Sequence, residues 1–183
     1  MILSILIPTL LDRAYILKNL MFEFYDQAET IGADGDIEIL TCEDGGEKTT
    51  GFKRNKLLND AIGEYIVFVD DDDNVAPFYC KLIMDALVKK PDVVGMRGVY
   101  IVNGMYDGIF EHSIKHKQWS QAGNKYYRCP NHLNPVKREL ALQAGFPDIK
   151  IGEDRDYSMK LLPLLKTEVM IETPIYEYYA RAK

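Results

Sequence analysis

The sequence lacks several features that mark particular classes of protein. No apolar run reaches the ~20 residues needed to span a bilayer, so we expect no membrane segment. The three cysteines are widely spaced and form no CxxC pair, which indicates neither a disulfide framework nor a thiolate zinc site and favours a reduced, cytoplasmic setting. The apolar N-terminus has neither a basic segment nor a small-residue cleavage site, and is typical of a first strand rather than a signal peptide.

Internal repeats, low-complexity tracts and Pro/Gly/Ser linkers are also absent. The 183 residues, 47% hydrophobic and 27% charged, suit one well-packed core, so we expect a single domain over residues 1–183. The net charge of -6 argues against stable binding of nucleic acid. Nothing in the sequence indicates an oligomeric state.

The first half alternates apolar runs with helical patterns. Strands are predicted at Leu3–Pro8, Ile37–Leu40 and Glu64–Asp70, the last apolar on both faces. Helices are predicted over about 13–28, 52–61 and 76–88. This order predicts an α/β fold, a three-layer sandwich with a mainly parallel central sheet.

The second half is less regular. Residues 92–102 and 104–111 are typical of strands, with a hairpin turn at Asn103 and Gly104. Helices are predicted over 136–146 and 153–165, and a closing strand over 173–181. Residues 113–130 have no clear period, so we expect a loop over a cleft.

Four consecutive aspartates, Asp70–Asp73, follow the apolar run EYIVFV. The carboxyl end of a strand in an open α/β sheet faces the ligand crevice, and clustered carboxylates suit Mg²⁺ or Mn²⁺, particularly when substrate phosphates complete the shell. The alternative is a solvated acidic turn that caps the next helix. An EF-hand is excluded, because Val75 stands where that loop needs glycine and no Glu closes it.

The segment EYIVFVDDDDNVAP resembles the family 2 glycosyltransferase pattern GEY-apolar-LD-x-DD-three residues-P. Three further segments match this family in order: IPTLLDR, EDGG and KRN, which resemble its PTxNR, DDGS and ARN elements. The first departs at Leu11 and Asp12, and the second has Glu43 and Gly46 for the usual Asp and Ser. The last segment, GFPDIKIGEDRDYSMKL, resembles the family's GxFDExFxxGEDxDLxxRL.

The resemblance implies a GT-A fold whose first half, about residues 1–95, binds a UDP-sugar. Asp70 and Asp72 would form the DxD motif and hold Mn²⁺ or Mg²⁺, Asp73 would support them, and Asp71 would be a bystander beside the donor. Asp44 would read the uracil edge. The donor-binding residues implied in this way are Pro8, Thr9, Arg13, Asp44, Arg54, Asn55, Asp70, Asp71 and Asp72.

The second half, about residues 96–183, would bind the acceptor and carry catalysis. In inverting members an acidic residue of the GED segment is the general base, which implies Asp154, with Glu153 second; both also suit a helix cap. Asn131 and His132 are candidates for the acceptor or donor-sugar pocket. Trp119 is a candidate for a sugar-stacking lid, and ordinary packing under a loop is the alternative.

Other basic and histidine side chains are expected to be structural or solvated. We interpret Lys53 and Lys56 as a solvated helix start, and His112 and His116 as surface residues.

The function implied is inverting, metal-dependent transfer of a sugar from a UDP-sugar to a hydroxyl acceptor. The alternatives are a retaining GT-A transferase or nucleotidyltransferase with the same metal site, and a catalytically weak nucleotide-sugar-binding module. A nucleotidyltransferase usually carries a Gly-rich phosphate loop after its first strand, which IPTLLDR lacks. The donor sugar and the acceptor are not encoded in any pattern that we recognise.

Overall fold

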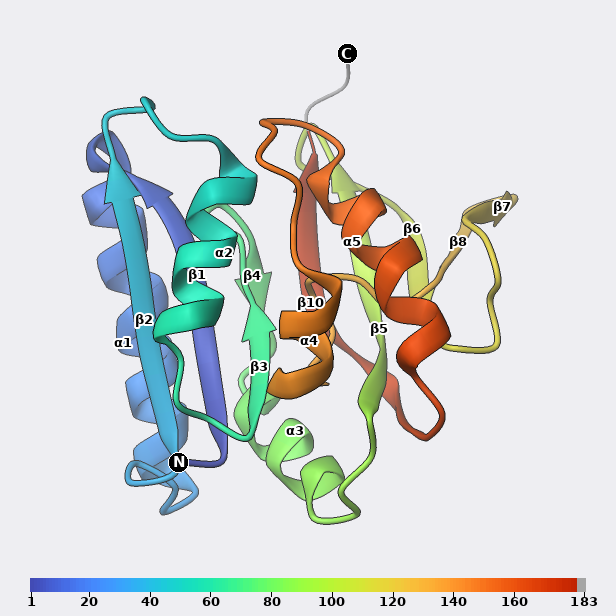
Figure 1. Ribbon diagram of the computed structural model, residues 1–183, viewed down its shortest axis with the longest axis horizontal. Helices are drawn as coiled ribbons and strands as arrows, with labels where there is room; N and C mark the ends of the chain where they lie inside the picture. Colours follow the sequence, from blue (N-terminus) through green and yellow to red (C-terminus); the bar gives the residue numbers. More distant parts are fainter. Residues whose placement is uncertain (181–183) are drawn as a thin grey trace.

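The computed structural model describes residues 1–180 and begins with three parallel strands. β1 (Leu3–Leu10) lies between β2 (Ile37–Asp44) and β3 (Tyr65–Phe68), and both pairings are parallel. α1 (Ala14–Thr30), preceded by the 3-10 turn η1 (Leu11–Arg13), connects β1 to β2, and α2 (Thr50–Asp60) connects β2 to β3 (Figure 1). The strands and crossover helices of the first half are confirmed, with ends shifted by a few residues.

Beyond β3 the sheet continues with strands from the second half of the chain. Its order is β2-β1-β3-β9-β5-β6-β8-β7, and β10 pairs with β5 and with β4 (Asn74–Val75). β9 (Val136–Lys137) is antiparallel to both β3 and β5 (Val93–Val102), whereas β10 (Glu168–Ala180) runs parallel to β5. The sheet is therefore mixed, because its parallel core is joined to the second half through one short antiparallel strand.

Helices cover both faces of this sheet and make the expected three layers (Figure 1). On one face, α1 and α3 (Tyr79–Leu87) pack side chains such as Phe24 and Ile83 into one core cluster. On the other face, α2, α4 (Arg138–Ala144) and α5 (Glu153–Leu161) form a second cluster around Phe68 and Tyr157. The 3-10 turn η2 (Leu162–Leu164) follows α5. None of the helices within residues 1–180 is long and apolar enough to cross a bilayer.

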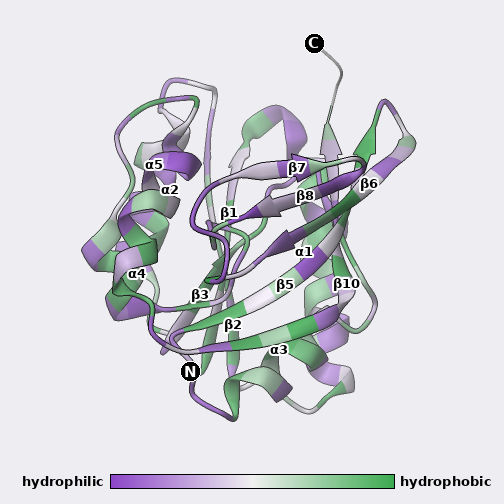
Figure 2. Ribbon diagram, turned by 90° about the vertical axis from the view of Figure 1, so that its right-hand side faces the viewer, coloured by the Kyte–Doolittle hydropathy of each residue, from purple (hydrophilic) through white to green (hydrophobic). Residues whose placement is uncertain are grey.

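The hairpin of β5 and β6 (Met105–His112) turns at Asn103 and Gly104, as predicted, and both residues have positive φ angles of 51° and 77°. The predicted loop 113–130 is only partly a loop, because β7 (Ser120–Ala122) and β8 (Lys125–Arg128) form an antiparallel hairpin whose second strand pairs with β6. This hairpin is largely hydrophilic (Figure 2), which explains why its strand character escaped hydrophobic patterning. The predicted closing strand begins earlier, at Glu168, and its last residue, at position 181, lies outside the described residues.

Candidate active site

The four aspartates form a turn after β3, and each has a different environment. Asp71 is buried and accepts hydrogen bonds from Thr9 Oγ1 at 2.5 Å and from Arg13 Nη1 at 2.6 Å. Asp73 is also buried and accepts from the Tyr176 hydroxyl at 2.8 Å and from the Tyr179 backbone N–H at 2.7 Å. The Asp71 carboxylate ties the end of β1 to the aspartate turn, and its predicted place as a bystander beside the donor stays a prediction.

Asp70 lies in a buried network of charges. It accepts a hydrogen bond from Arg54 Nη2 at 2.8 Å, and its second oxygen lies 3.4 Å from His132 Nε2. Burial by itself would raise the pKa of Asp70, but the charges of Arg54 and His132 outweigh burial and hold the pKa well below its ordinary value. Asp70 is therefore ionised throughout the physiological pH range.

Asp72 differs from its neighbours because its carboxylate is open to solvent. Its side chain is 53% exposed, and one oxygen lies 3.1 Å from Arg13 Nη1. Partial burial raises the pKa of Asp72, with Asp70 and Asp71 adding to this and Arg13 opposing it. Of the four aspartates, Asp72 is the one placed to accept a ligand from solution.

Arg54 joins the strand end to α5. Its side chain is 3% exposed, and its terminal nitrogens donate to Asp70 at 2.8 Å and to Glu153 Oε1 at 2.8 Å. The guanidinium also lies 5.8 Å from the Phe68 ring centroid and 5.7 Å from that of Phe146. Since both terminal nitrogens are engaged by carboxylates, the structure gives Arg54 the role of a framework residue, and its contact with a diphosphate stays a prediction.

Lys53, in the first turn of α2, is buried rather than solvated. Lys53 was expected to be solvated, but it is 5% exposed and donates from Nζ to the Thr9 carbonyl at 2.7 Å and to Asp44 Oδ1 at 2.8 Å. The Lys53 hydrogen bond, together with the Lys48 backbone N–H, lowers the pKa of Asp44 to about 2. Lys53 is buried because its ammonium group donates hydrogen bonds to acceptors at the ends of both β1 and β2.

Asn55 donates to the Phe146 carbonyl at 2.8 Å and accepts from the Phe146 N–H at 2.9 Å, so its amide fixes the loop before α5. Neither Asn55 nor Asp44 lines a cavity at the strand ends within the described residues. Their predicted contacts with a nucleotide stay predictions.

Two cavities meet at this strand end. The first, which we call the charged cleft, has a volume of about 500 Å³. It is lined by Pro8, Thr9, Leu10, Arg13, Gly46, Lys48, Thr50, Lys53, Arg54, Asp70, Asp71, Asp72, Lys150, Ile151 and Glu153. Lys48 and Lys150 at its wall are exposed, and sequence reasoning missed both because they lie in loops without a pattern. The cleft therefore combines a carboxylate floor with cations that an anionic ligand can reach.

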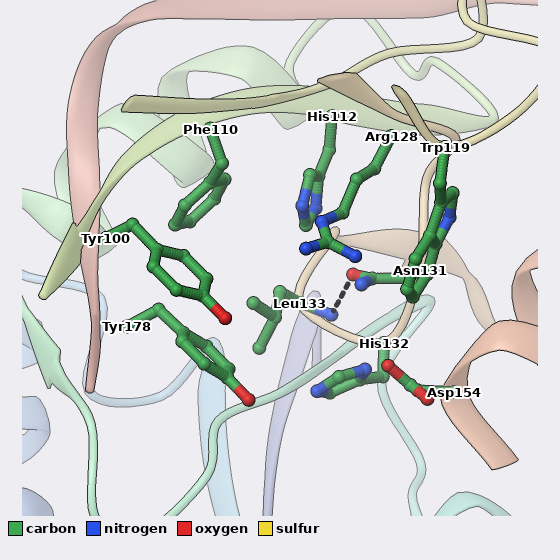
Figure 3. A pocket seen from close by; sticks show the side chains of 10 residues that line it. All are labelled: Tyr100, Phe110, His112, Trp119, Arg128, Asn131, His132, Leu133, Asp154 and Tyr178. Atoms are coloured by element: carbon green, nitrogen blue, oxygen red, sulfur yellow. Dashed lines mark hydrogen bonds between the residues drawn. The ribbon is translucent and has the colours of Figure 1, made fainter. Parts of the chain in front are cut away.

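The second cavity, which we call the aromatic pocket, has a volume of about 160 Å³ (Figure 3). It is lined by Tyr100, Phe110, His112, Trp119, Arg128, Asn131, His132, Leu133, Asp154 and Tyr178. The structure thus brings together Trp119, Asn131, His132 and Asp154, which the sequence analysis proposed as site residues from three separate segments. Asn131 itself accepts from the Leu133 backbone N–H at 3.0 Å, and so shapes the loop that carries His132.

Several residues of the aromatic pocket were missed. His112, expected on the surface, is 2% exposed, and its Nδ1 lies 3.1 Å from Asn134 Oδ1. Tyr100 and Tyr178 lie opposite each other in the β5–β10 register and stack at 5.1 Å. No local motif predicts such a pair, because it depends on the register between two strands that are far apart in the sequence.

The two carboxylates that open α5 face different cavities. Glu153 lines the charged cleft and is bonded to Arg54. Burial raises the pKa of Glu153, and the Arg54 charge opposes this. Asp154 lines the aromatic pocket, where Figure 3 shows its carboxylate near the His132 ring.

The fit of a divalent ion rests on Asp72 and Asp70. Within residues 1–180 no group of three or more His, Cys, Asp or Glu side chains is arranged to hold an ion alone. Mg²⁺ in proteins is commonly held by one or two carboxylates, with waters and substrate phosphates completing its shell. The exposed Asp72 beside the ionised Asp70 fits that mode. These two carboxylates would hold the ion only together with a phosphate-bearing ligand.

The overall arrangement matches known structures. A crystal structure of S. aureus TarS residues 1–349 in complex with UDP-GlcNAc superposes with a TM-score of 0.68 at 14% identity, covering 100% of this chain and 60% of that one. The same TarS segment without a named ligand gives 0.67 at 17% identity over 98% of this chain, again 60% of that one. The chain has the GT-A fold. It spans about 60% of the TarS 1–349 segment and 37% of the longer TarS structure.

No family model and no curated protein matches the sequence. In this GT-A fold the charged cleft lies where β1, β2 and β3 end, which is the ligand-binding edge of open α/β sheets. At this level of identity the likeness establishes the fold, and the chemistry has to be argued from the residues of this chain.

Proposed function

We propose that the protein transfers a sugar from a UDP-sugar to a hydroxyl acceptor with inversion at the anomeric carbon. The observation that carries the proposal is the meeting of the two cavities. The charged cleft and the aromatic pocket adjoin at Asp70 and His132, which lie 3.4 Å apart, and at the consecutive residues Glu153 and Asp154. A donor in the first cavity and an acceptor in the second would meet there.

The charged cleft suits a nucleoside diphosphate. Arg13, Lys48 and Lys150 supply positive charge along its wall, and cations of this kind bind phosphate oxygens through charge-assisted hydrogen bonds. The complex of TarS with UDP-GlcNAc supports UDP as the carrier, since that protein shares the fold. UDP-GlcNAc is accordingly the donor with which to begin.

A divalent ion, Mn²⁺ or Mg²⁺, would be held by Asp72 and Asp70 together with the diphosphate. When bound there, the ion supplies charge neutralisation for the leaving UDP. Arg13, bonded to Asp71 and Asp72, stands at the same edge of the cleft and adds positive charge from the chain itself.

Asp154 is the general base in this proposal. It lines the aromatic pocket, is half-buried, and has no hydrogen bond or ion pair to a side chain within the described residues. Its neighbour Glu153 is engaged by Arg54 and is less able to act. Asp154 takes the proton of the acceptor hydroxyl while the hydroxyl oxygen attacks the anomeric carbon opposite UDP, and a single displacement of this kind inverts the anomeric centre.

The test is turnover of UDP-GlcNAc with Mn²⁺ and a panel of hydroxyl acceptors, measured beside UDP binding. Asp154→Asn should lower kcat roughly 10²–10⁴-fold and leave UDP affinity within about twofold. Asp156→Asn is the matched control, since Asp156 lies in the same helical turn and pairs with Lys160, and it should retain turnover. If the wild-type protein binds UDP with Mn²⁺ but turns over no donor with any acceptor, the transferase proposal is contradicted and a nucleotide-sugar-binding module is favoured.

A further inference from the structure

Arg128 is an arginine without a carboxylate partner inside the aromatic pocket. It is half-buried, and its guanidinium carbon lies 4.2 Å from the Trp119 ring centroid. Figure 3 shows the guanidinium directed into the pocket beside His112 and Asn131. Within residues 1–180 it forms no ion pair, whereas Arg13, Arg54 and Arg97 each have one at 2.6–2.8 Å.

No side chain of the pocket forms an ion pair with Arg128 within the described residues. Asp154 is the one carboxylate among the described lining residues, and it makes no ion pair with Arg128. Burial, with the Arg128 charge as the second cause, lowers the pKa of His112 to about 3, so His112 is neutral at physiological pH. The net charge that faces a ligand there is therefore set by Arg128 and Asp154.

The pocket also holds buried nitrogen atoms that lack partners. Trp119 Nε1 and His132 Nδ1 are buried and accept or donate no hydrogen bond within the described residues. The indole N–H is a donor only, whereas His132 Nδ1 is an acceptor when the other ring nitrogen donates to Asp70. Buried polar groups of native proteins are normally satisfied by protein, water or ligand, so the Trp119 N–H is a buried donor available to a ligand in this pocket.

We propose that the aromatic pocket binds an anionic group, a phosphate or a carboxylate, through Arg128. The inference rests on the proposed function, in which donor and acceptor meet at this pocket, and it makes Arg128 a specificity-determining residue. A guanidinium binds either anion through two parallel N–H···O bonds. The stacked rings of Tyr100 and Tyr178 provide an apolar face for a sugar beside it. The charge has two possible carriers, the acceptor and the transferred sugar.

The first experiment follows Trp119 fluorescence, which reports on this pocket alone because the chain has one tryptophan. Glucose 6-phosphate, glucuronate and glucose are titrated into the full chain with UDP and Mn²⁺ present, so that the charged cleft is filled. We expect at least one of the two anions to bind roughly 10–100-fold more tightly than glucose. Equal binding of all three probes, or no binding, would overturn the inference and leave Arg128 as a group that only stacks on Trp119.

Variants separate charge from packing. Arg128→Met should lose the preference for the anion, and Arg128→Lys should keep part of it, since it keeps the charge and loses the planar fork. Arg155→Met is the matched control, because Arg155 is exposed on α5 and lines neither cavity. If Arg128→Met fails to fold, the Arg128→Lys result decides: an unchanged preference for every probe would contradict a bidentate contact.

A second titration identifies the carrier. If the anion still binds when UDP-GlcNAc replaces UDP, the acceptor carries the charge; if UDP-GlcNAc displaces it, the transferred sugar does. Neither result depends on turnover, so the inference and the proposed function fail separately. Equal binding of charged and neutral probes would contradict the inference alone, and absence of UDP binding would contradict the proposed donor site alone.

Discussion

The charged cleft and the aromatic pocket adjoin, yet they are built in opposite ways. In the charged cleft, the side chains of Lys53, Arg54, Asp70 and Asp71 have partners within 2.5–2.8 Å. In the aromatic pocket, Arg128 has no carboxylate partner within the described residues and Asp154 has no side-chain partner there. The paired charges of the cleft thus form a framework that joins β1, β3, α2 and α5, whereas Arg128 and Asp154 of the pocket stay available to a ligand.

Removing Arg54 should have the largest effect on stability. Arg54→Met leaves Asp70 and Glu153 without their shared cation, and breaking a buried ion pair in this way costs about 3–5 kcal/mol. Arg155→Met, on the exposed face of α5, should change the free energy of unfolding by less than about 0.5 kcal/mol. Urea denaturation of both variants measures the difference. A loss below about 1 kcal/mol for Arg54→Met would contradict the framework role of the cleft.

Glu111 lies between Phe110 and His112 of the aromatic pocket, and substituting it tests whether paired charges stabilise the fold there too. Burial raises the pKa of Glu111, but Lys115, His116 and Arg97 together lower it to about 2. A carboxylate with a depressed pKa contributes stability above its unfolded pKa of about 4.3, and this contribution is lost as pH falls towards 2. Glu111→Gln should therefore cost on the order of 3 kcal/mol at pH 7. That gap should close between about pH 4.5 and pH 2, and a gap independent of pH would contradict the assignment.

Gly98 lies beneath the aromatic pocket, and an added methyl group there should disturb the pocket without touching the cleft. A Cβ at Gly98 would lie 2.2 Å from Phe110 Cζ and 2.5 Å from the Tyr176 carbonyl oxygen. Gly98→Ala should destabilise the protein by about 1–3 kcal/mol and shift Trp119 fluorescence. Gly35→Ala, where a Cβ meets nothing within 4 Å, is the control. Thermal unfolding of the two variants side by side checks this, and equal melting temperatures would refute it.

The smallest effect is expected at Thr9, which donates one of the two hydrogen bonds that Asp71 receives. Thr9→Val should cost about 1 kcal/mol, because Arg13 continues to pair with Asp71. Thr9→Ser keeps the hydroxyl and should lose less. Denaturation midpoints compare the two variants, and a Thr9→Ser variant as unstable as Thr9→Val would argue against this hydrogen bond.

The sequence predicted some residues of each cavity and missed others, and each outcome has a physical reason. Asp70 and Asp72 stand at the end of an apolar strand, so hydrophobic patterning alone places them at the ligand-binding edge. The burial of Lys53 was missed, because its partners Thr9 and Asp44 come from other strand ends. The pairing of Tyr100 with Tyr178 was also missed, since it depends on a register between β5 and β10 that no local pattern encodes.

The central claim is that the charged cleft binds UDP through an ion held at Asp72. Calorimetric titration of UDP, with and without Mn²⁺, tests it on wild-type protein, on Asp72→Asn and on Asp12→Asn, an exposed control on the turn after β1. We expect one UDP to bind in a manner that depends on Mn²⁺, with roughly 10–100-fold weaker binding in Asp72→Asn and no change in Asp12→Asn. UDP that binds wild-type protein and Asp72→Asn equally, or binds neither, would contradict the claim.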